Sequence, residues 1–247
     1  MSPDLALALR LAQAADEISL GRFRARDLVV ETKADATPVT DADTAVEAAI
    51  RALLAEERPE DGILGEEEGD LTGATSRRWI VDPIDGTRNY SRGIPVWATL
   101  IALEEEGVVR LGVVSAPALH RRWWAERGGG AHVDGDQIRV SAVRRVEDAV
   151  LTFALEHPLP GLAAQAWHSR GYGDFWGHML VAEGAADGCI DAIGVSPWDL
   201  AALQPIVEEA GGTFTDFAGE RRIDGGSAIS SNGHVHAALL EAAAALR

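Results

Sequence analysis

The sequence predicts an α+β protein whose helices and strands form mixed layers in two subdomains. Apolar runs of strand length cluster in the first half of the chain, whereas strands and helices alternate in the second half. The chain has 247 residues, of which 47% are apolar and 25% are charged, and this globular composition excludes disorder. The character of the sequence changes near residue 142. We therefore expect an N-terminal α+β subdomain over residues 1–142 and a C-terminal α/β subdomain over residues 143–247.

Two helices and a set of strands are expected in the first subdomain. Apolar residues recur at helical spacing from Leu5 to Ile18, and Gly21 ends this pattern. A second helix is expected to begin near Thr40 and to end before Pro59. Short apolar runs between charged or glycine-rich turns predict strands. These runs are residues 79–81, 96–103, 108–114, 123–125 and 138–140.

Strands and helices are expected to alternate in the second subdomain. One helix has Pro197 in its first turn, and Gly211 and Gly212 end it. The expected strands are residues 150–155, 190–193, 213–217 and 228–230. The expected helices are residues 175–186, residues 197–210 and an alanine-rich helix at the end of the chain.

The chain is strongly acidic, with 39 acidic residues, 22 basic residues and a formal net charge of −17. It has no basic block that could displace counterions from DNA or bind an anionic membrane surface. Its apolar runs are shorter than a membrane span, and its N-terminus lacks the pattern of a signal peptide. The single cysteine, Cys189, excludes an intrachain disulfide. We expect a cytoplasmic protein that binds neither nucleic acid nor membranes, and that binds anions only through metal ions.

Residues 82–87, Asp-Pro-Ile-Asp-Gly-Thr, form the most informative segment. Asp82 and Asp85 follow an expected strand, and Gly86 allows a sharp turn after them. Hard divalent cations such as Mg²⁺ prefer carboxylate oxygens together with the phosphate oxygens of a substrate. If a helix begins near Thr87, its free N–H groups also attract a phosphate. The alternative is an aspartate-rich turn that only caps a helix.

Three further acidic segments each have a structural alternative. Glu66 lies in the sequence Gly-Glu-Glu-Glu-Gly, which on its own is typical of a solvated turn. Asp43 follows Thr40 in a pattern close to a capping box before a helix. Asp199 lies in the first turn of the helix with Pro197, where a carboxylate is favourable without a metal. The order of the four segments along the chain favours a shared site.

Together these segments resemble the inositol monophosphatase family of metal-dependent phosphatases, over nearly the whole chain. Residues 65–67 resemble its Gly-Glu-Glu element, and residues 82–87 match its Asp-Pro-Ile-Asp-Gly-Thr signature without a mismatch. Residues 198–199 match its late Trp-Asp element, residues 40–43 its Thr-x-x-Asp element, and residues 128–131 its glycine-rich turn. The resemblance implies a layered αβαβα sandwich, a homodimer and a small phosphorylated metabolite as the substrate.

The resemblance also implies two or three Mg²⁺ ions in each active site. The first ion would be held by Glu66, Asp82 and the backbone carbonyl of Ile84. The second would be held by Asp82, Asp85 and Asp199. Asp43 would help to hold a weaker third ion.

The catalytic residues that the resemblance implies are Glu66, Asp82, Asp85 and Thr87. Thr87 and Glu66 would orient and activate the attacking water, and the backbone amides of Gly86 and Thr87 would cradle the phosphate. Two cations suit in-line hydrolysis, because they neutralise a phosphate dianion that otherwise repels hydroxide, lower the pKa of the bound water and stabilise the leaving alkoxide. The reaction then needs neither a covalent enzyme intermediate nor a histidine base.

Finer features resemble one branch, the histidinol-phosphate phosphatases of inositol monophosphatase type. The matching segments are residues 33–40, 92–98, 115–119, 121–124, 172–175 and 198–203. Extra carboxylates near the leaving group would favour the cationic histidinol over a neutral inositol ring. Asp174 and Asp191 are the candidates for this substrate-binding role, although Asp174 has the alternative role of a helix N-cap.

We therefore expect hydrolysis of L-histidinol phosphate to L-histidinol and phosphate, a step of histidine biosynthesis. One alternative is an inositol monophosphatase or another small phosphomonoesterase, acting on phosphoadenosine phosphate or fructose bisphosphate. A non-catalytic metal-binding protein is the other alternative, which the intact set of acidic residues and Thr87 disfavours.

Overall fold

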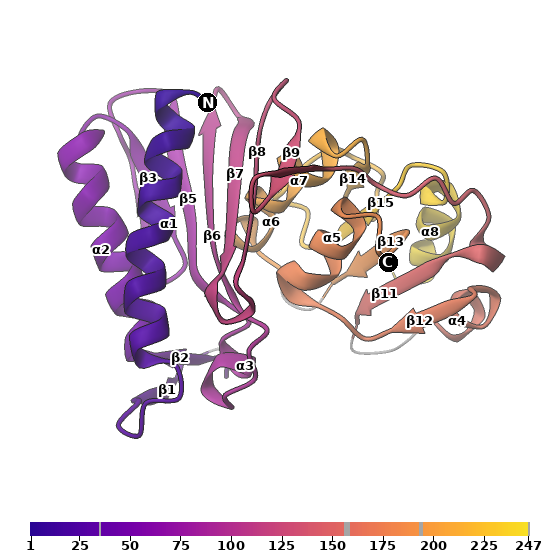
Figure 1. Cartoon of the computed structure of the whole chain (residues 1–247), viewed down its shortest axis with the longest axis horizontal. Helices are drawn as coiled ribbons and strands as arrows, with labels where there is room; N and C mark the ends of the chain where they lie inside the picture. Colours follow the sequence, from indigo (N-terminus) through magenta and orange to yellow (C-terminus); the bar gives the residue numbers. More distant parts are fainter. Residues whose placement is uncertain (35, 156–158, 193–194, 247) are drawn as a thin grey trace.

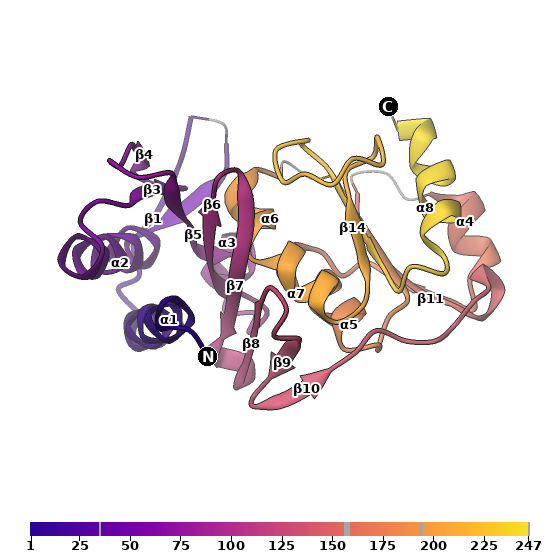
Figure 2. The same ribbon diagram turned by 90° about the horizontal axis from the view of Figure 1, so that it is seen from above.

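The computed structural model describes residues 1–34, 36–155, 159–192 and 195–246, and it shows five layers in the order αβαβα (Figure 1). Seen from above, the layers run from α1 and α2 on one side to α4 and α8 on the other (Figure 2). Two sheets stand between these outer layers, and a layer of helices separates the sheets. The layered arrangement expected from the family resemblance is confirmed.

Among the described residues, eight strands form the first sheet, in the order β10-β9-β8-β7-β6-β5-β3-β4. Neighbouring strands are antiparallel except for β3 and β5, which are parallel. The strands are β3 (Gly62–Gly65), β4 (Gly69–Leu71), β5 (Arg77–Asp85), β6 (Ala98–Glu105), β7 (Val108–Ala116), β8 (Arg121–Glu126), β9 (Ala131–Val133) and β10 (Asp136–Ile138).

The central strands of this sheet are apolar on both faces because helices cover both of them. On β5, Trp79 and Val81 pack against α1 (Pro3–Arg22) and α2 (Asp41–Glu57). Ile80 points to the other face and packs against the middle layer. Side chains alternate between the two faces of a strand, so Asp82, two residues after Ile80, also points toward the middle layer.

The middle layer contains α5 (Asp174–Ala182), α6 (Pro197–Ala201) and α7 (Leu203–Glu209). Phe175 and Met179 of α5 and Ile206 of α7 belong to one buried cluster that also includes residues of both sheets. Helix α6 contacts β5 and β6 of the first sheet. The first turns of α5 and α6 therefore lie close to the end of β5.

The second sheet has the order β12-β11-β13-β15-β14 in the described part of the chain. Its strands are β11 (Val150–Ala154), β12 (His168–Arg170), β13 (Gly188–Asp191), β14 (Thr213–Thr215) and β15 (Ala228–Ser231). Helices α4 (Pro160–Gln165) and α8 (His236–Ala243) cover its outer face through Leu162 and Leu239. Short 3₁₀ turns, residues 117–119, 146–148 and 244–246, complete the elements.

A small antiparallel hairpin and a short helix lie at one end of the first sheet (Figure 1). The hairpin consists of β1 (Val30–Thr32) and β2 (Pro38–Thr40), and β2 contacts the short helix α3 (Thr87–Ser91). Neither hairpin strand is expected from the sequence. The helix considered near Thr87 on sequence grounds is present as α3. The hairpin leads directly into α2, which begins at Asp41 next to Thr40.

Several expected elements have different limits in the structure. The helix expected at 197–210 is divided into α6 and α7 at Ala202, because Pro205 has no N–H to donate to the carbonyl of Ala201. The strand expected at 138–140 ends at Ile138, and the strand expected at 213–217 ends at Thr215. Helix α5 ends at Ala182, before the expected 186, while β13 covers 188–191 and β6 covers 98–105. The limits of β5, β7, β8, β11 and β15 also differ from those expected, by one to four residues at an end. Ile193, from the expected strand 190–193, and Asp35, from the segment 33–40, lie outside the described residues.

Candidate active site

A cavity of about 490 Å³ lies where β5, α3, α5, α6 and β13 meet. The residues expected at the active site that line it are Glu66, Asp82, Ile84, Asp85, Gly86, Thr87, Asp174, Asp191 and Asp199. Asp43 is buried beside Thr87 and is not part of the lining. A second cavity of about 530 Å³ lies between α1 and β8, and none of the expected site residues line it.

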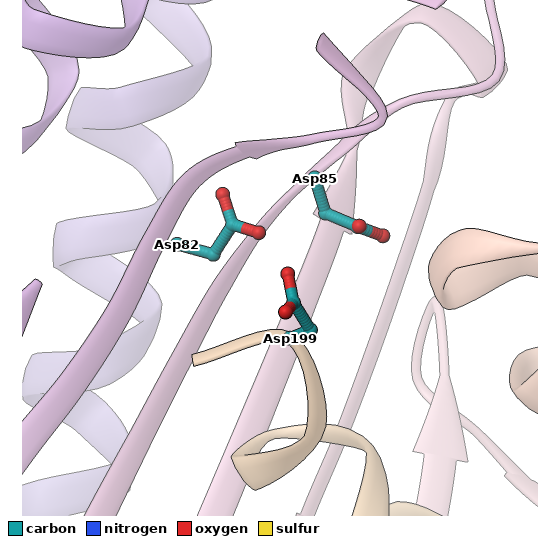
Figure 3. Close-up of side chains that lie close together, drawn as sticks. All are labelled: Asp82, Asp85 and Asp199. Carbon is teal, nitrogen blue, oxygen red and sulfur yellow. The ribbon is translucent and has the colours of Figure 1, made fainter. Parts of the chain in front are cut away.

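Three carboxylates gather at the floor of the first cavity. Asp82, Asp85 and Asp199 each offer an oxygen, and these oxygens lie within 4.8 Å of one another. Figure 3 shows the carboxylates of Asp82, from β5, and Asp199, from α6, directed toward each other, with the side chain of Asp85 beside them.

An irregularity in β5 places two of these carboxylates on one face of the sheet. In a regular strand, residues three apart point to opposite faces. Here Asp82 pairs with Leu100 and Asp85 pairs with Ala98, so three steps on β5 match two steps on β6. The buried Thr99 hydroxyl donates to the carbonyl of Pro83 at 2.8 Å, inside this bulge. Both aspartates therefore face the middle layer and the first turn of α6.

Each of the three carboxylates also accepts a hydrogen bond from a backbone N–H. The N–H of Ile84 donates to Asp82 Oδ1 at 3.0 Å, and the N–H of Phe175 donates to Asp85 Oδ2 at 2.6 Å. The N–H of Ser196 donates to Asp199 Oδ2 at 2.5 Å, as in a capping box. These bonds fix each side chain, so both interpretations of Asp199, the cap and the site residue, are compatible.

Burial and mutual repulsion raise the pKa of all three carboxyl groups. For Asp82, burial raises the pKa well above its usual range, and the charges of Glu66, Asp85 and Asp199 raise it further. Burial and the charges of Asp174 and Asp199 have the same effect on the pKa of Asp85. The pKa of Asp199 rises to about 7, mainly through burial. A cluster of buried like charges made only of oxygen donors fits a hard divalent cation such as Mg²⁺.

Thr87 connects this cluster to Asp43. The Thr87 hydroxyl lies 2.9 Å from the carbonyl oxygen of Ile84 and 3.2 Å from Asp43 Oδ1, and its single proton serves one of them at a time. Asp43 Oδ2 accepts from the N–H of Thr40 at 2.8 Å and from its hydroxyl at 2.5 Å. The capping box expected for Asp43 is therefore present, and its second oxygen faces the site. Burial, reinforced by the charge of Glu66, raises the pKa of Asp43 to about 6.

Gly86 occupies a backbone conformation that few other residues adopt. Its φ of 84° lies in the left-handed region, and it is the N-cap residue of α3. A Cβ at this position would lie 3.1 Å from the carbonyl oxygen of Val96 and 3.4 Å from Asp174 Oδ2. The turn between β5 and α3 therefore requires glycine, and it lines the cavity.

Glu66 lines the same cavity and pairs with the only lysine of the chain. Lys33 Nζ lies 2.8 Å from Glu66 Oε1 and 2.7 Å from Glu67 Oε1. Burial by itself lowers the pKa of Lys33, but the hydrogen bonds and charges of Glu66 and Glu67 outweigh this effect and raise it. Lys33 follows β1, so the hairpin contacts the acidic site directly. The sequence does not reveal this contact, because the partners are 33 residues apart.

A buried carboxylate of α2 anchors the acidic turn around Glu66. Glu47 of α2 is fully buried, and its carboxylate accepts the N–H groups of Glu67 at 2.8 Å and Glu68 at 3.0 Å. Arg51 pairs with the same carboxylate at 2.8 Å. The turn at residues 65–69 is therefore anchored to α2, while its three glutamates stay partly or fully exposed, as in the alternative of a solvated turn.

Asp174 and Asp191 both lie at the wall of the cavity. Asp174 is the first residue of α5, has a φ of 53° and is exposed at the cavity. Asp191 is the last residue of β13 and is only 3% exposed. The surrounding protein and the charge of Asp191 raise the pKa of Asp174 to about 6. The alternative that Asp174 serves as the N-cap is wrong, because Gly173 holds that position and Asp85 accepts the N–H of Phe175.

His178 is a residue near the cavity that the sequence does not single out. It is fully buried on α5, and its Nε2 lies 3.5 Å from Asp191 Oδ2. The signal in the sequence is its spacing of four residues from Asp174 on an expected helix, which places both on one face. Two histidines near the end of the chain, His234 and His236, differ in burial. His234 is exposed, whereas His236 is buried and contacts Thr215 and Ser231.

The layered fold and the acidic cavity define a class of protein, a phosphomonoesterase built around a cluster of carboxylates. The sequence model of the inositol monophosphatase family matches residues 1–247. A Mycobacterium tuberculosis protein named histidinol-phosphatase is 52% identical over 96% of this chain and 96% of its own. A Streptomyces coelicolor protein of the same name is 48% identical over 96% of this chain and 95% of its own.

Solved structures agree with these relatives. The crystal structure of extragenic suppressor protein suhB from Bartonella henselae has a TM-score of 0.91 with this chain, at 33% identity, and covers 98% of both chains. The protein belongs to the inositol monophosphatase family. The expectation of a phosphomonoesterase of this family, which acts on small phosphorylated substrates, is confirmed. In the described part of the chain, no helix has both the length and the apolar character that crossing a membrane requires.

Proposed function

We propose that this enzyme hydrolyses L-histidinol phosphate to L-histidinol and phosphate in histidine biosynthesis. The observation that carries the proposal is the arrangement of the cavity. A buried carboxylate cluster, Asp82, Asp85 and Asp199, forms its floor, and two further carboxylates, Asp174 and Asp191, lie at its wall. The names of the two relatives described above support the same substrate.

The residues of the floor fit Mg²⁺, and we assign two or three ions to them. Glu66, Asp82 and the carbonyl of Ile84 would hold the first, Asp82, Asp85 and Asp199 the second, and Asp43 would help to hold a third. The raised pKa values of the buried carboxyl groups support this assignment, because a cation removes the repulsion among their charged forms. When bound, the ions supply charge neutralisation for the phosphate and a lower pKa for a coordinated water.

The protein itself positions the reactants. Thr87, fixed by Ile84 and Asp43, and Glu66 orient the attacking water. The turn at Gly86 brings the backbone amides of Gly86 and Thr87 to the cavity, where they cradle the phosphate. Water attacks in line with the leaving oxygen, and no covalent intermediate with a side chain is required. None of these residues is a histidine, so the water is activated without an imidazole base.

The wall of the cavity accounts for the choice of substrate. L-Histidinol carries an ammonium group and an imidazole, whereas inositol is neutral. Asp174 and Asp191 raise the negative charge on the leaving-group side of the cavity, which favours a cationic alcohol. A neutral inositol ring gains nothing from these charges and leaves them unpaired, so inositol monophosphatase activity is the less supported alternative.

A phosphate-release panel tests this proposal. Purified enzyme with Mg²⁺ is compared on L-histidinol phosphate, inositol phosphate and phosphoadenosine phosphate, and a parallel series contains a chelator. We expect the highest kcat/KM for histidinol phosphate and loss of activity in the chelator. A higher kcat/KM for either other substrate would reject the histidinol assignment. Metal binding without any turnover would reject the enzyme assignment.

We further propose that the enzyme is a cytoplasmic homodimer. Exposed aromatic residues support a contact between copies, since Trp167 is 72% exposed and Tyr172 is 42% exposed. Both flank β12, which is an edge strand of the second sheet. The absence of any cysteine pair in the sequence suits a reducing compartment.

A further inference from the structure

His178 of α5 lies between the second sheet and the cavity wall, and two contacts hold its ring in place. Its Nδ1 lies 2.9 Å from the hydroxyl oxygen of Ser230, which is fully buried on β15. Its ring packs against Phe214 of β14, with ring centroids 5.7 Å apart. These two contacts fix the plane of the imidazole and direct Nε2 toward Asp191, 3.5 Å from Oδ2.

The buried Nε2 is the unexplained part of this arrangement. It is inaccessible to solvent and makes no hydrogen bond of acceptable geometry in the described part of the chain. A buried polar atom without a partner is costly, and the Asp191 carboxylate at 3.5 Å is an acceptor that a small side-chain adjustment brings into hydrogen-bond range. We therefore expect this hydrogen bond to form when substrate is bound, because hydrogen bonds in active sites tighten in the substrate complex.

Asp191 lies where the imidazole of His178 can help to orient it toward the substrate. It is 3% exposed at the cavity wall, and its charge raises the pKa of both Asp85 and Asp174. A hydrogen-bond donor next to a carboxylate orients it and favours its charged form. His178 can serve as such a donor: burial by itself lowers the pKa of its imidazole, but the neighbouring Cys189 and Asp191 outweigh burial and raise this pKa above its usual range.

We propose that His178 is a positioning residue that holds Asp191 Oδ2, so that the carboxylate presents its other oxygen to the ammonium or imidazole group of a cationic leaving alcohol. This inference rests on the proposed function for its substrate and on the geometry of His178, Ser230 and Asp191 for its mechanism. The imidazole does not touch the phosphate. Its effect is on the binding of cationic substrates and not on the chemical step.

The first experiment compares His178→Leu with the wild-type enzyme on two substrates. L-Histidinol phosphate carries a cationic leaving group, and phenyl phosphate does not. We expect the KM for histidinol phosphate to rise about tenfold, as for one lost hydrogen bond to a charged group, while kcat changes little. The KM for phenyl phosphate should change far less. Equal increases for both substrates would overturn the inference.

Two further substitutions separate positioning from packing. His178→Gln keeps an N–H donor near the place of Nε2, so it should recover most of the lost affinity for histidinol phosphate. His236→Leu is the matched control, because His236 is also a buried histidine between two hydroxyl groups, Thr215 and Ser231. It should lower the melting temperature without changing the ratio of the two KM values. If His236→Leu changes the ratio of the two KM values as much as His178→Leu does, the inference is overturned.

A double-mutant cycle tests whether His178 acts through Asp191. Asp191→Ala alone should raise the KM for histidinol phosphate more than the KM for phenyl phosphate. Adding His178→Leu to it should cause no further increase, since nothing remains to be positioned. A second increase of about the same size would show that the two residues act independently and would overturn the inference. If His178→Leu does not fold, Ser230→Ala removes the anchor at Nδ1 and takes its place in the cycle.

A crystal structure of His178→Leu tests the positioning without any substrate. We expect the Asp191 carboxylate to adopt another rotamer there, and an unchanged Asp191 overturns the inference. If the wild-type enzyme does not hydrolyse histidinol phosphate, the proposed function is rejected. The crystallographic result would still decide the role of His178.

Discussion

At the scale of single residues, the acidic side chains of this site have two tasks each. Asp43 and Asp199 cap α2 and α6, Asp85 accepts an N–H of α5, and Asp82 accepts the N–H of Ile84. One oxygen of each carboxylate is committed to the backbone, so these side chains cannot swing apart to relieve their repulsion. The fold thereby preorganises a cluster of charges that a cation stabilises.

This double role makes Asp85→Asn an informative variant. The amide oxygen of asparagine still accepts the N–H of Phe175, whereas the charge is lost. We expect Mg²⁺-dependent turnover to fall by more than about 100-fold. This loss exceeds the one typical of a residue that only hydrogen-bonds to a metal ligand. The far-ultraviolet circular dichroism should not change. Wild-type turnover in this variant would contradict the assignment.

Asp216→Asn provides the control for that measurement. Asp216 is also a buried aspartate, and it accepts the N–H groups of Ala218 at 2.7 Å and Glu220 at 2.9 Å, away from the cavity. Turnover should remain close to that of the wild-type enzyme. A similar loss in both variants would show that buried aspartates matter here only for folding.

The raised pKa values predict how Mg²⁺ stabilises the protein at different pH. A carboxyl group with a higher pKa in the folded chain makes the folded state bind more protons, so the free energy of unfolding falls as pH rises between the two values. For Asp199 this window runs from its ordinary value of 3.8 to about 7. Without metal, stability should fall across this range, and Mg²⁺ should restore it because the cation replaces the protons.

Differential scanning calorimetry with and without Mg²⁺ measures this effect. At a metal concentration of about 100 Kd, the melting temperature at pH 8 should rise by roughly 5–10 °C. At pH 4.5 the increase should be much smaller, because protons occupy the same oxygens. An increase that does not depend on pH would contradict a site made of these carboxyl groups.

The sequence allowed the acidic residues to be predicted, because Asp82, Asp85 and Asp199 lie in short local patterns. Lys33, Glu47 and His178 act on partners that are distant in the sequence, and only the folded chain determines these distances. Spacing alone also could not show that Asp82 and Asp85 share a face. That depends on the bulge in β5, which a regular strand does not have.

At the scale of elements, long periodic helices were predictable and short elements were not. The helices α1 and α2 have clear apolar stripes, and both are present as expected. The strands β1, β2, β4 and β12 have three residues each, which is too short for a periodic pattern. The break between α6 and α7 was predictable in principle from Pro205. At this break the carbonyl of Ala202 packs directly on Gly112 of β7.

The turn between β5 and α3 gives a prediction at the same scale. Gly86→Ala forces a Cβ into the left-handed region and within 3.1 Å of the carbonyl oxygen of Val96. Gly107→Ala is the matched control, because Gly107 has a φ of 73° but open space around it. The control should lose about 1–2 kcal/mol of unfolding free energy from the backbone alone.

Gly86→Ala should lose about 1 kcal/mol more than the control, together with most of the activity, because the methyl group displaces the turn that lines the cavity. Urea denaturation monitored by tryptophan fluorescence measures both losses. Equal destabilisation of the two variants would show that the close approach at Gly86 costs nothing.

At the scale of the whole molecule, the two sheets and the middle helices bring distant segments to one cavity. The strands of the first sheet end at Ile138 and those of the second begin at Val150, while α6 and α7 pack on the first sheet from the second half of the chain. Asp199 reaches Asp82 only through this packing. The division into subdomains at residue 142 stays a prediction, as do the homodimer and the cytoplasmic location.

The proposed dimer predicts an effect of Trp167. Replacing this 72% exposed residue by serine should shift the protein from dimer to monomer at micromolar concentration. Leu71→Ser is the control, because Leu71 is 56% exposed on β4, at the edge of the other sheet. Light scattering coupled to size-exclusion chromatography measures the masses. A monomeric wild-type enzyme, or equal shifts in both variants, would reject a contact at Trp167.

The central claim is that the net charge of −17 includes a cluster of carboxylates that binds divalent cations for phosphate chemistry. Mn²⁺ can replace Mg²⁺ at oxygen sites and scatters anomalously, so crystals soaked in Mn²⁺ test this claim most directly. We predict an anomalous difference peak bounded by Asp82, Asp85 and Asp199. An enzyme that is active with Mn²⁺ but shows no peak among these three residues would contradict the account.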